Sequence, residues 1–358
     1  MRQLSLFVEE SRALDVFAYR GKLFVLTYEG AIQTYDVSQL AQDLAAAHGD
    51  TGLVIAYGLF SSIGIGASPE MKAAWKNFDH ASSHTLSFHA SPASETRSIA
   101  DASVYVDMRI YYNRLYLATD RGTFATRLDA DGRLSNAGAD MERLTTERTE
   151  SLSTGMGAVG ASLGDEGLAI FTEVGGREPG VHHRIERRSL RSSIGGGRSV
   201  NYPTHSSFES LSSTINLDAL GRRTLVDVAA STSDADKEIE LSEGSYAIWE
   251  AGRLLIGDET GVTSLGRMVN KKSRQVSSAT RRERPLSLGV TGNRIVVTES
   301  PQRITAARGD QEIVLREGPA VSVRTFSGSR RYKRLIAATV EGGLLLSAVF
   351  LSGDDELT

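Results

Sequence analysis

The sequence predicts an all-β fold made of repeated four-stranded units, and three observations predict it. A short apolar strand that ends in an acidic residue and a glycine, followed by a second strand, occurs at least six times in the 358 residues. Glycine is frequent, with 35 copies, and proline is rare, with 7, which suits many tight hairpin turns. The last repeats are regularly spaced, because Leu254, Ile295 and Leu335 hold equivalent positions 41 and 40 residues apart.

A period of about 40–45 residues with four strands per repeat is typical of a β-propeller. Six repeats are clear, and the wider intervals between the earlier ones leave room near 60–102 and near 205–243 for either a degenerate repeat or a repeat with an insertion. We therefore expect residues 1–358 to form a single β-propeller domain of about seven blades, within a range of six to eight.

The first repeat predicts four strands and an inserted helix. The strands are expected at 14–19, 22–28, 31–36 and 52–57. The residues near 38–48 predict a short helix, with Ser38 as its N-cap and Gly49 as its stop. A second helical insertion is predicted near 69–78.

The same order of strands recurs in the later repeats. Strands are expected at 103–110, 114–119, 123–128, 168–172, 182–190, 320–326, 335–340 and 344–351. The last repeat lacks one strand, whereas the N-terminus offers a spare strand at 3–8. Pairing of that strand with the last blade would close the ring and remove its open edge.

At this level the sequence resembles the β-propeller superfamily, of the WD40-like or quinoprotein-like kind. The resemblance covers nearly the whole chain and rests on the repeated hairpin. No Trp-Asp dipeptide ends the third strands, although Tyr35-Asp36 and Leu128-Asp129 approximate it. The resemblance therefore implies an architecture and carries over no family's functional residues.

Composition limits the classes of function. The chain has no cysteine, which excludes disulfides, thiolate nucleophiles and cysteine-based metal sites. The apolar stretch at the N-terminus is too short for a secretory signal, and acidic residues follow it directly. No run of the sequence approaches the ~18 apolar residues of a membrane helix. We expect a soluble cytoplasmic protein with no cofactor, no metal and no membrane contact.

Basic residues form three clusters although the net charge is −4. The clusters contain Arg184, Arg187 and Arg188; Lys271, Lys272, Arg274, Arg281, Arg282 and Arg284; and Arg330 and Arg331. One reading is an ordinary solvated surface. The other is that, if the strand order holds, the clusters lie on the face opposite acidic turns such as those at Glu29 and Asp120 and bind an acidic partner protein or phosphates. Aromatic residues for stacking on single-stranded bases are sparse nearby, apart from Tyr332 and Tyr202, which weakens nucleic acid as the partner.

The inserted helix near 69–78 carries an apolar stripe. Met71, Trp75 and Phe78 lie on one helical face, together with Ala74. This stripe either packs back on the propeller or docks on a partner, where aromatic anchors often dominate binding.

The candidates for chemistry are weaker. His80, His84 and His89 lack a chelating pattern, and the GxGxxG match that starts at Gly155 enters a β-hairpin instead of a βαβ unit. Asp15, Asp107 and Glu250 lie on predicted first strands without forming a convincing constellation.

The sequence is therefore compatible with three functions. The first is a non-catalytic protein–protein interaction scaffold or complex subunit. The second is a propeller enzyme, a hydrolase or lyase, with its site at the mouth of the central channel. The third is an accessory subunit that binds nucleic acid.

Overall fold

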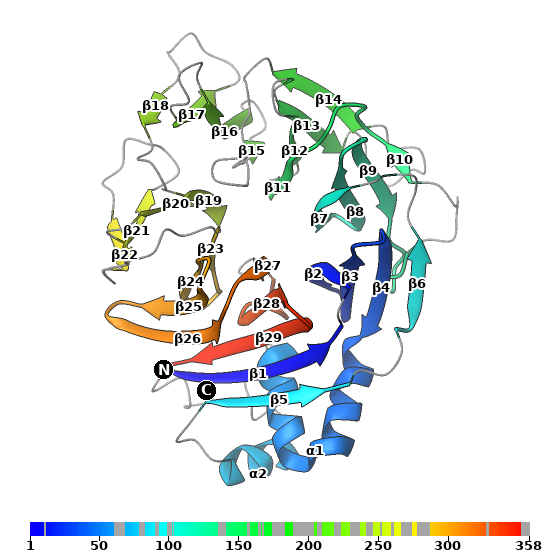
Figure 1. Ribbon diagram of the computed structural model, residues 1–358, viewed down its shortest axis with the longest axis vertical. Helices are drawn as coiled ribbons and strands as arrows, with labels where there is room; N and C mark the ends of the chain where they lie inside the picture. Colours follow the sequence, from blue (N-terminus) through cyan, green and yellow to red (C-terminus); the bar gives the residue numbers. More distant parts are fainter. Residues whose placement is uncertain are drawn as a thin grey trace. The chain divides into compact units, whose positions relative to one another are not determined.

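The structure is a computed structural model of the chain, and its strands and helices are labelled in Figure 1. It describes residues 1–10, 12–60, 69–78, 83–89, 93–98, 102, 104–134, 141–155, 158–163, 166, 168–173, 183–188, 204–205, 210–217, 223–229, 237–240, 246–250, 253–258, 261–265, 274–277, 287–326 and 329–351. The chain divides into two compact units. One contains Met1–Ser98 and Val276–Thr358, and the other contains Ile99–Gln275.

The first sheet of the first unit is the four-stranded β2-β3-β4-β6. Its strands are β2 (Ala13–Tyr19), β3 (Lys22–Thr27), β4 (Ala31–Asp36) and β6 (Glu95–Ser98). The first three agree with the sequence prediction. The fourth does not, because residues 52–57 are helical and the outer strand comes from Glu95–Ser98 instead. A short apolar run fits a buried helix as well as a strand, so its periodicity could not distinguish the two.

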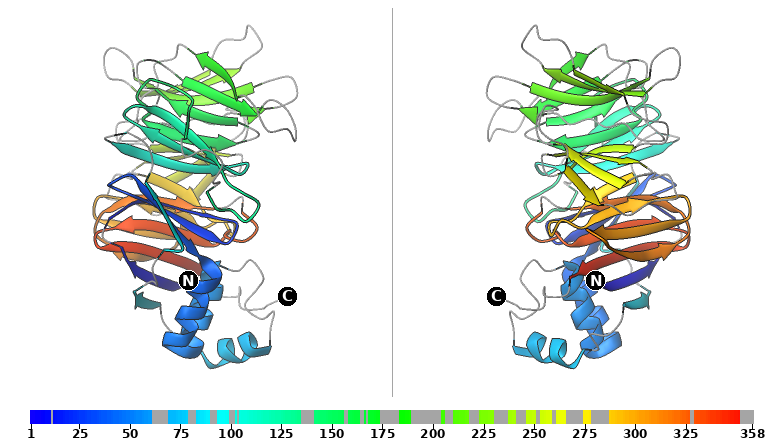
Figure 2. Two further views of the ribbon diagram at one scale, coloured as in Figure 1. Left: turned by 90° about the vertical axis from the view of Figure 1, so that its right-hand side faces the viewer. Right: turned by 90° about the vertical axis from the view of Figure 1, so that its left-hand side faces the viewer.

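Helix α1 (Val37–Phe60) forms a helical hairpin, since Gly49 interrupts it with a φ of 56° and a ψ of −136°. We call Val37–His48 the first arm and Asp50–Phe60 the second arm. The arms meet closely at Gly52, where a Cβ atom would lie 2.0 Å from the carbonyl oxygen of Leu44. The predicted stop at Gly49 is therefore a turn inside a longer element. Helix α2 (Pro69–Asn77) follows, and both views of Figure 2 show the two helices beyond the sheets at one end of this unit.

The second sheet of this unit has five strands in the order β27-β28-β29-β1-β5. They are β27 (Ala320–Thr325), β28 (Leu335–Val340), β29 (Gly343–Phe350), β1 (Arg2–Glu9) and β5 (His84–Phe88). Strand β1 pairs antiparallel with β29 along its whole length and parallel with β5 on its other side. The N-terminal strand is therefore an interior strand of its sheet.

The third sheet is β23-β24-β25-β26. It consists of β23 (Ser287–Val290), β24 (Val296–Glu299), β25 (Arg303–Arg308) and β26 (Gln311–Glu317). One core cluster of the unit joins α1 to the β1 and β29 strands, and another joins this third sheet to β28 and β29. Buried aliphatic side chains on both faces of these strands hold neighbouring sheets together.

The second unit contains the sheets β10-β9-β8-β7, β11-β12-β13-β14 and β15-β16-β17-β18, and the sheet β19-β20-β21-β22 begins in it. The strands of the first two are β7 (Tyr105–Tyr111), β8 (Arg114–Thr119), β9 (Gly122–Arg127), β10 (Glu142–Arg143), β11 (Ser151–Gly155), β12 (Ala158–Ser162), β13 (Leu168–Glu173) and β14 (His183–Arg188). The match to GxGxxG falls on the antiparallel pair β11 and β12. That location agrees with the sequence argument against a dinucleotide loop.

The remaining strands of this part of the chain form two antiparallel sheets. They are β15 (Thr204–His205), β16 (Ser210–Leu217), β17 (Arg223–Ala229), β18 (Lys237–Glu240), β19 (Tyr246–Glu250), β20 (Arg253–Asp258), β21 (Gly261–Leu265) and β22 (Arg274–Ser277). Of the stretch 205–243, thought to hold a degenerate repeat, the described part supplies β16, β17 and β18.

Candidate docking groove

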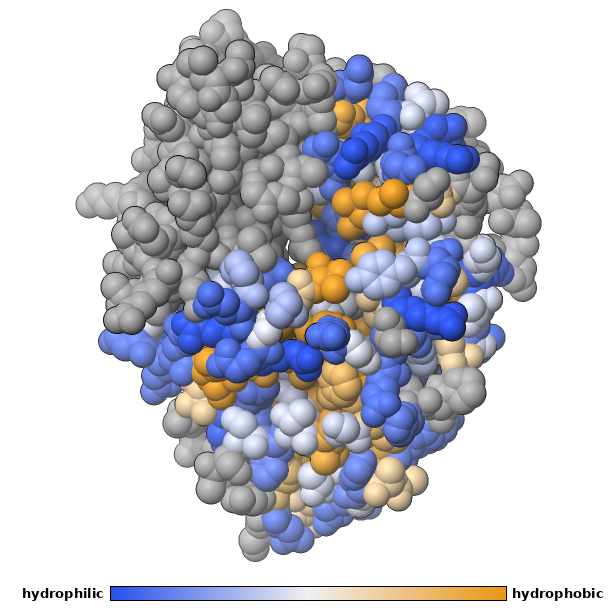
Figure 3. All heavy atoms as spheres, in the orientation of Figure 1, coloured by the Kyte–Doolittle hydropathy of each residue, from blue (hydrophilic) through white to orange (hydrophobic). Residues whose placement is uncertain are grey.

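A cavity of about 590 Å³ lies between the two arms of α1 and the loop that joins β27 to β28. The first arm contributes the apolar Val37, Ala41 and Ala45 and the polar Ser38 and Gln42. The second arm contributes Leu53, Ala56, Tyr57 and Phe60. Arg330 and Arg331 from the loop complete the wall. We call this cavity the α1 groove; Figure 3 shows hydrophobic side chains reaching the surface over the α1 region among hydrophilic ones.

The first arm is held in place by Asp36, which caps it. The Oδ1 atom of Asp36 accepts the backbone N–H groups of Ser38 and Gln39 at 2.8 and 3.3 Å. Its Oδ2 atom accepts the Nζ of Lys22 at 2.5 Å. The N-cap is therefore Asp36, whereas the sequence suggested Ser38. Both residue types cap helices well.

The charge of Asp36 is stabilised by these contacts. Desolvation by burial raises the pKa of this carboxyl, but the hydrogen bonds from Lys22, Gln39 and Ser38 outweigh it, and the pKa falls below its ordinary value of 3.8. The ionised cap thus links β3, β4 and the first turn of α1.

The second arm lies on the five-stranded sheet. Ile55 and Leu59 are fully buried in the same cluster as Leu6 and Leu346 of β1 and β29. Gly58 lies against Leu4, which brings the helix backbone close to the sheet. Since one face of this arm is buried on the sheet, Leu53 and Tyr57 are left only half-buried toward the groove.

Tyr332 anchors the loop that carries the arginines. Its side chain is 2% exposed, and its hydroxyl accepts the backbone N–H of Gly21 at 2.8 Å. Desolvation by burial raises the pKa of this phenol. The residue is therefore a structural anchor, and its ring is not available to stack on a nucleic acid base.

Arg330 and Arg331 directly precede this anchor in the sequence, and both are exposed. The guanidinium of Arg331 lies beside Gly21, 5.8 Å from the ring centroid of Tyr332. Two neighbouring loops add cations. Arg20 directly precedes Gly21 in one loop. In the other loop, the N–H of Gly292 donates to the carbonyl of Lys333, and Arg294 follows Gly292 by two residues. We call the group Arg20, Arg294, Arg330, Arg331 and Lys333 the basic rim.

Four members of the basic rim have no acidic partner among the described residues. In the part of the chain that the structure describes, no carboxylate lies within ion-pair distance of Arg294, Arg330, Arg331 or Lys333. A cationic edge beside an apolar groove can receive a ligand with one apolar and one anionic part.

The structure places the other predicted docking residues away from this groove or leaves their side chains undescribed. Phe78 packs on the protein itself, with its ring centroid 4.4 Å from that of His84, and Ala74 is 1% exposed. The side chains outside the described set belong to Met71 and Trp75 of α2, Arg184, Arg187 and Arg188 of β14, and Arg274 of β22. Lys271, Lys272, Arg281, Arg282 and Arg284 lie entirely outside the described residues, as do Tyr202 and His80.

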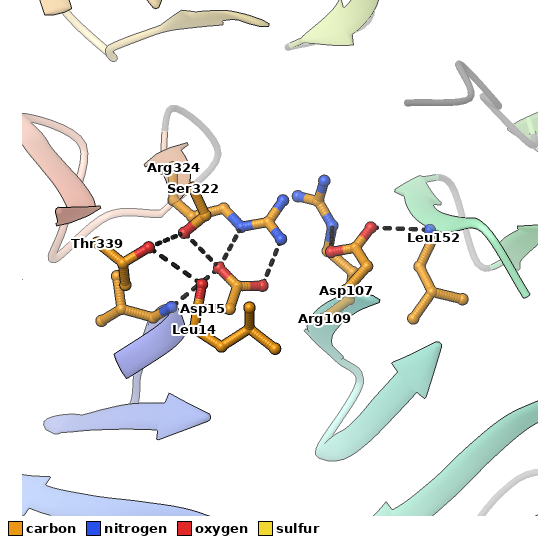
Figure 4. Close-up of polar contacts among 9 residues, drawn as sticks. Leu14, Asp15, Asp107, Arg109, Leu152, Ser322, Arg324 and Thr339 are labelled. Atoms are coloured by element: carbon orange, nitrogen blue, oxygen red, sulfur yellow. Dashed lines mark hydrogen bonds and ion pairs between the residues drawn. The ribbon is translucent and has the colours of Figure 1, made fainter. Parts of the chain in front are cut away.

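Both oxygens of the Asp15 carboxylate make contacts that hold the fold together (Figure 4). It is 2% exposed and receives the Nε of Arg324 at 3.0 Å and the hydroxyl of Ser322 at 2.9 Å. The Nη2 of Arg324 reaches the second oxygen, which makes the ion pair bidentate. This pair joins β2 to β27 and leaves little room for an acid–base role.

Asp107 is engaged in the same way in the second unit. Its Oδ2 accepts the backbone N–H of Leu152 at 2.8 Å, and the Nε of Arg109 lies 3.5 Å from its Oδ1 (Figure 4). Both aspartates follow a register shift at the start of a first strand. The side chain of Glu250, the third candidate, is outside the described set.

The described residues contain neither a cluster of metal ligands nor a helix that could span a membrane. Among the described residues, no group of three or more potential ligands is placed to hold a metal ion. His89 instead pairs with Glu9 at 3.1 Å. No helix in the described ranges combines the length and apolar character needed to cross a bilayer.

Comparison with solved structures shows a β-propeller fold. BBS1N in complex with ARL6DN has a TM-score of 0.55 and 9% identity, covering 98% of this chain and 99% of that one. The WD40 β-propeller domain of Doa1 has a TM-score of 0.52 and 11% identity, covering 98% and 97%. A catalytically inactive virginiamycin B lyase from Staphylococcus aureus with quinupristin has a TM-score of 0.52 and 9% identity, covering 97% and 99%.

No protein-family model matches the sequence, and no curated protein matches it either. At such low identity the likeness concerns architecture alone, and this set includes both a complex with a protein and an enzyme. The chain is a β-propeller protein, as its repeated hairpins predicted.

Proposed function

We propose that this protein is an interaction module that binds another protein through the α1 groove and the basic rim. One observation carries the proposal: an insertion between two strands of one sheet builds an apolar groove, and at its wall lie Arg330 and Arg331, which are exposed and have no carboxylate partner among the described residues. Propeller blades need no such insertion, so the groove is a feature added to the scaffold. The occupant that fits an apolar floor and a cationic wall is an acidic protein surface.

The proposal includes the architecture that presents this groove. We propose a single propeller of seven blades, closed by β1 as the fourth strand of the last blade, in a cytoplasmic protein. The pairing of β1 with β29 from Arg2 opposite Phe350 to Glu9 opposite Gly343 supports the closure. A closed ring would give the docking groove a rigid base.

The other predicted docking residues remain part of the proposal as secondary contacts. The arginines of β14 and β22 and the lysines and arginines at 271–284 would add charge-dependent contacts, and Met71, Trp75 and Phe78 would add apolar ones. Phe78 is the weakest member, because it already packs against His84.

Catalysis and nucleic-acid binding are less well supported. Asp15 and Asp107 already make structural contacts, and the described residues hold no group of three or more His, Asp or Glu side chains placed to bind a metal ion. Tyr332, which directly follows Arg330 and Arg331 in the sequence, is buried. The exposed side chains of Arg330 and Arg331 are instead suited to binding a partner protein.

The test compares the full chain with Arg330→Glu/Arg331→Glu. The control is Arg133→Glu/Arg308→Glu, which changes the charge equally at two exposed arginines that do not line the groove. We expect a partner that co-purifies with the wild-type chain at moderate salt to be retained by the control and lost by the groove variant. The same purified partner should bind the variant at least about tenfold more weakly. Equal retention by both variants would contradict the proposal.

A further inference from the structure

We propose that the α1 groove receives an amphipathic α-helix of the partner protein, with carboxylates at one end of its apolar stripe. The inference rests on the proposed function and adds the shape and polarity of what is bound.

The two walls of the groove are antiparallel helix arms joined by the turn at Gly49. Each arm turns one stripe of side chains to the groove. The first arm offers Val37, Ala41 and Ala45 at every fourth position. A furrow between two helices is the place where a third helix packs, with its side chains between theirs.

The backbone of the walls argues against an extended occupant. A bound strand draws its affinity from main-chain hydrogen bonds to an open sheet edge. Helix arms have no such edge, because their N–H and C=O groups are already bonded within each arm. An occupant that satisfies its own backbone, as a helix does, leaves nothing unpaired when it enters the groove.

The spacing along the walls fits about two turns of helix. The stripe from Val37 to Ala45 covers about 12 Å at the rise of 1.5 Å per residue. Ala41 and Ala45 are small and only half-buried, so an occupant can approach closely, while the half-buried Leu53 and Tyr57 supply apolar contact area. Anchors at positions i, i+3 or i+4, and i+7 of a bound helix match this length.

The charge lies at one end of the groove. The N–H of Val37 donates to the carbonyl of Gly21 at 2.9 Å, and the guanidinium of Arg331 lies beside that same glycine. The arginines are therefore at the end where the first arm begins, opposite the turn at Gly49. Carboxylates on the occupant would lie at this end and apolar anchors along the remainder, and bidentate pairing would suit the guanidinium groups.

The experiment selects displayed random peptides of about 16 residues, long enough to form a helix, on the wild-type chain. Counter-selection uses Ala45→Phe, which fills the groove from the face of α1 that is only half-buried. A thermal melt equal to that of wild type establishes that this variant is folded. Arg330→Glu/Arg331→Glu serves as a second counter-selection target.

We expect the enriched peptides to carry apolar residues at i, i+3 or i+4, and i+7, with Asp or Glu clustered at one end. They should gain helical circular dichroism on binding. Affinity should fall about tenfold or more for either variant. An absence of enrichment, apolar residues in strict alternation, or equal binding to Ala45→Phe would each overturn the inference.

Failure of this inference is distinct from failure of the proposed function. If the co-purifying partner depends on Arg330 and Arg331 but selected peptides are not helical, the groove binds a protein in another form. If the partner ignores both variants, the proposed function itself fails.

Discussion

The most consequential single residues are those that carry charge inside the protein. Asp15 and Arg324 are 2% and 5% exposed, and each satisfies the other. A buried ion pair adds little net stability compared with apolar residues, but removing one partner strands a buried charge. The pair therefore fixes how β2 lies against β27 more than it adds free energy.

Replacing Asp15 by alanine should lower the free energy of unfolding by about 3–5 kcal/mol, because Arg324 is left buried without its partner. Urea denaturation at neutral pH measures the change. The double variant Asp15→Ala/Arg324→Met should recover much of the loss, since no unpaired charge remains. A loss below about 1 kcal/mol for the single variant would show that Arg324 finds another partner.

At the scale of the element, α1 depends on the residue that starts it. Asp36 caps the first arm through two backbone N–H groups and also pairs with Lys22. The sequence alone suggested Ser38, two residues later, because cap types are shared and helix boundaries shift by a residue or two.

Two substitutions separate the cap from the charge of Asp36. Asp36→Ala should cost about 0.5–2 kcal/mol of stability, whereas Asp36→Asn should keep most of the cap. The lowered pKa means that ionised Asp36 stabilises the fold above its ordinary value of 3.8 and that this stabilisation is lost as pH falls through the folded-state pKa. Melts from pH 7 to pH 2.5 should therefore show a shallower acid limb for Asp36→Asn. An unchanged limb would contradict this account.

Local signals explain which elements could be predicted. Strands 31–36 and 335–340 were predicted with the bounds that the structure gives, since alternation and turn glycines are local. The second arm was missed, although Leu53, Ala56, Tyr57 and Phe60 have the helical spacing that could have revealed it. The groove could not be predicted, because Val37 and Arg331 are far apart in the sequence and are brought together beside Gly21 by the fold.

At the scale of the whole molecule, the two ends of the chain share one sheet. Strand β1 lies between β29 and β5, so it is hydrogen-bonded on both sides. The second arm of α1 packs on the same strand through Gly58 and Leu4. The N-terminal strand thus supports both the last sheet and the base of the groove.

Deletion of residues 1–10 should lower the melting temperature sharply and expose the edges of both β29 and β5. Differential scanning calorimetry of the truncated and full chains measures the effect. A substitution confined to the exposed Glu9, such as Glu9→Gln, is the matched control and should change the melt little. A truncated chain with an unchanged melt would contradict closure by β1.

The central claim is that a protein partner docks in the α1 groove, and hydrogen–deuterium exchange locates the partner most directly. The full chain is compared with and without its co-purifying partner. We predict slower exchange in residues 37–60 and 329–334, and no such change when the chain carries Arg330→Glu/Arg331→Glu. Protection confined to other parts of the chain would contradict the claim.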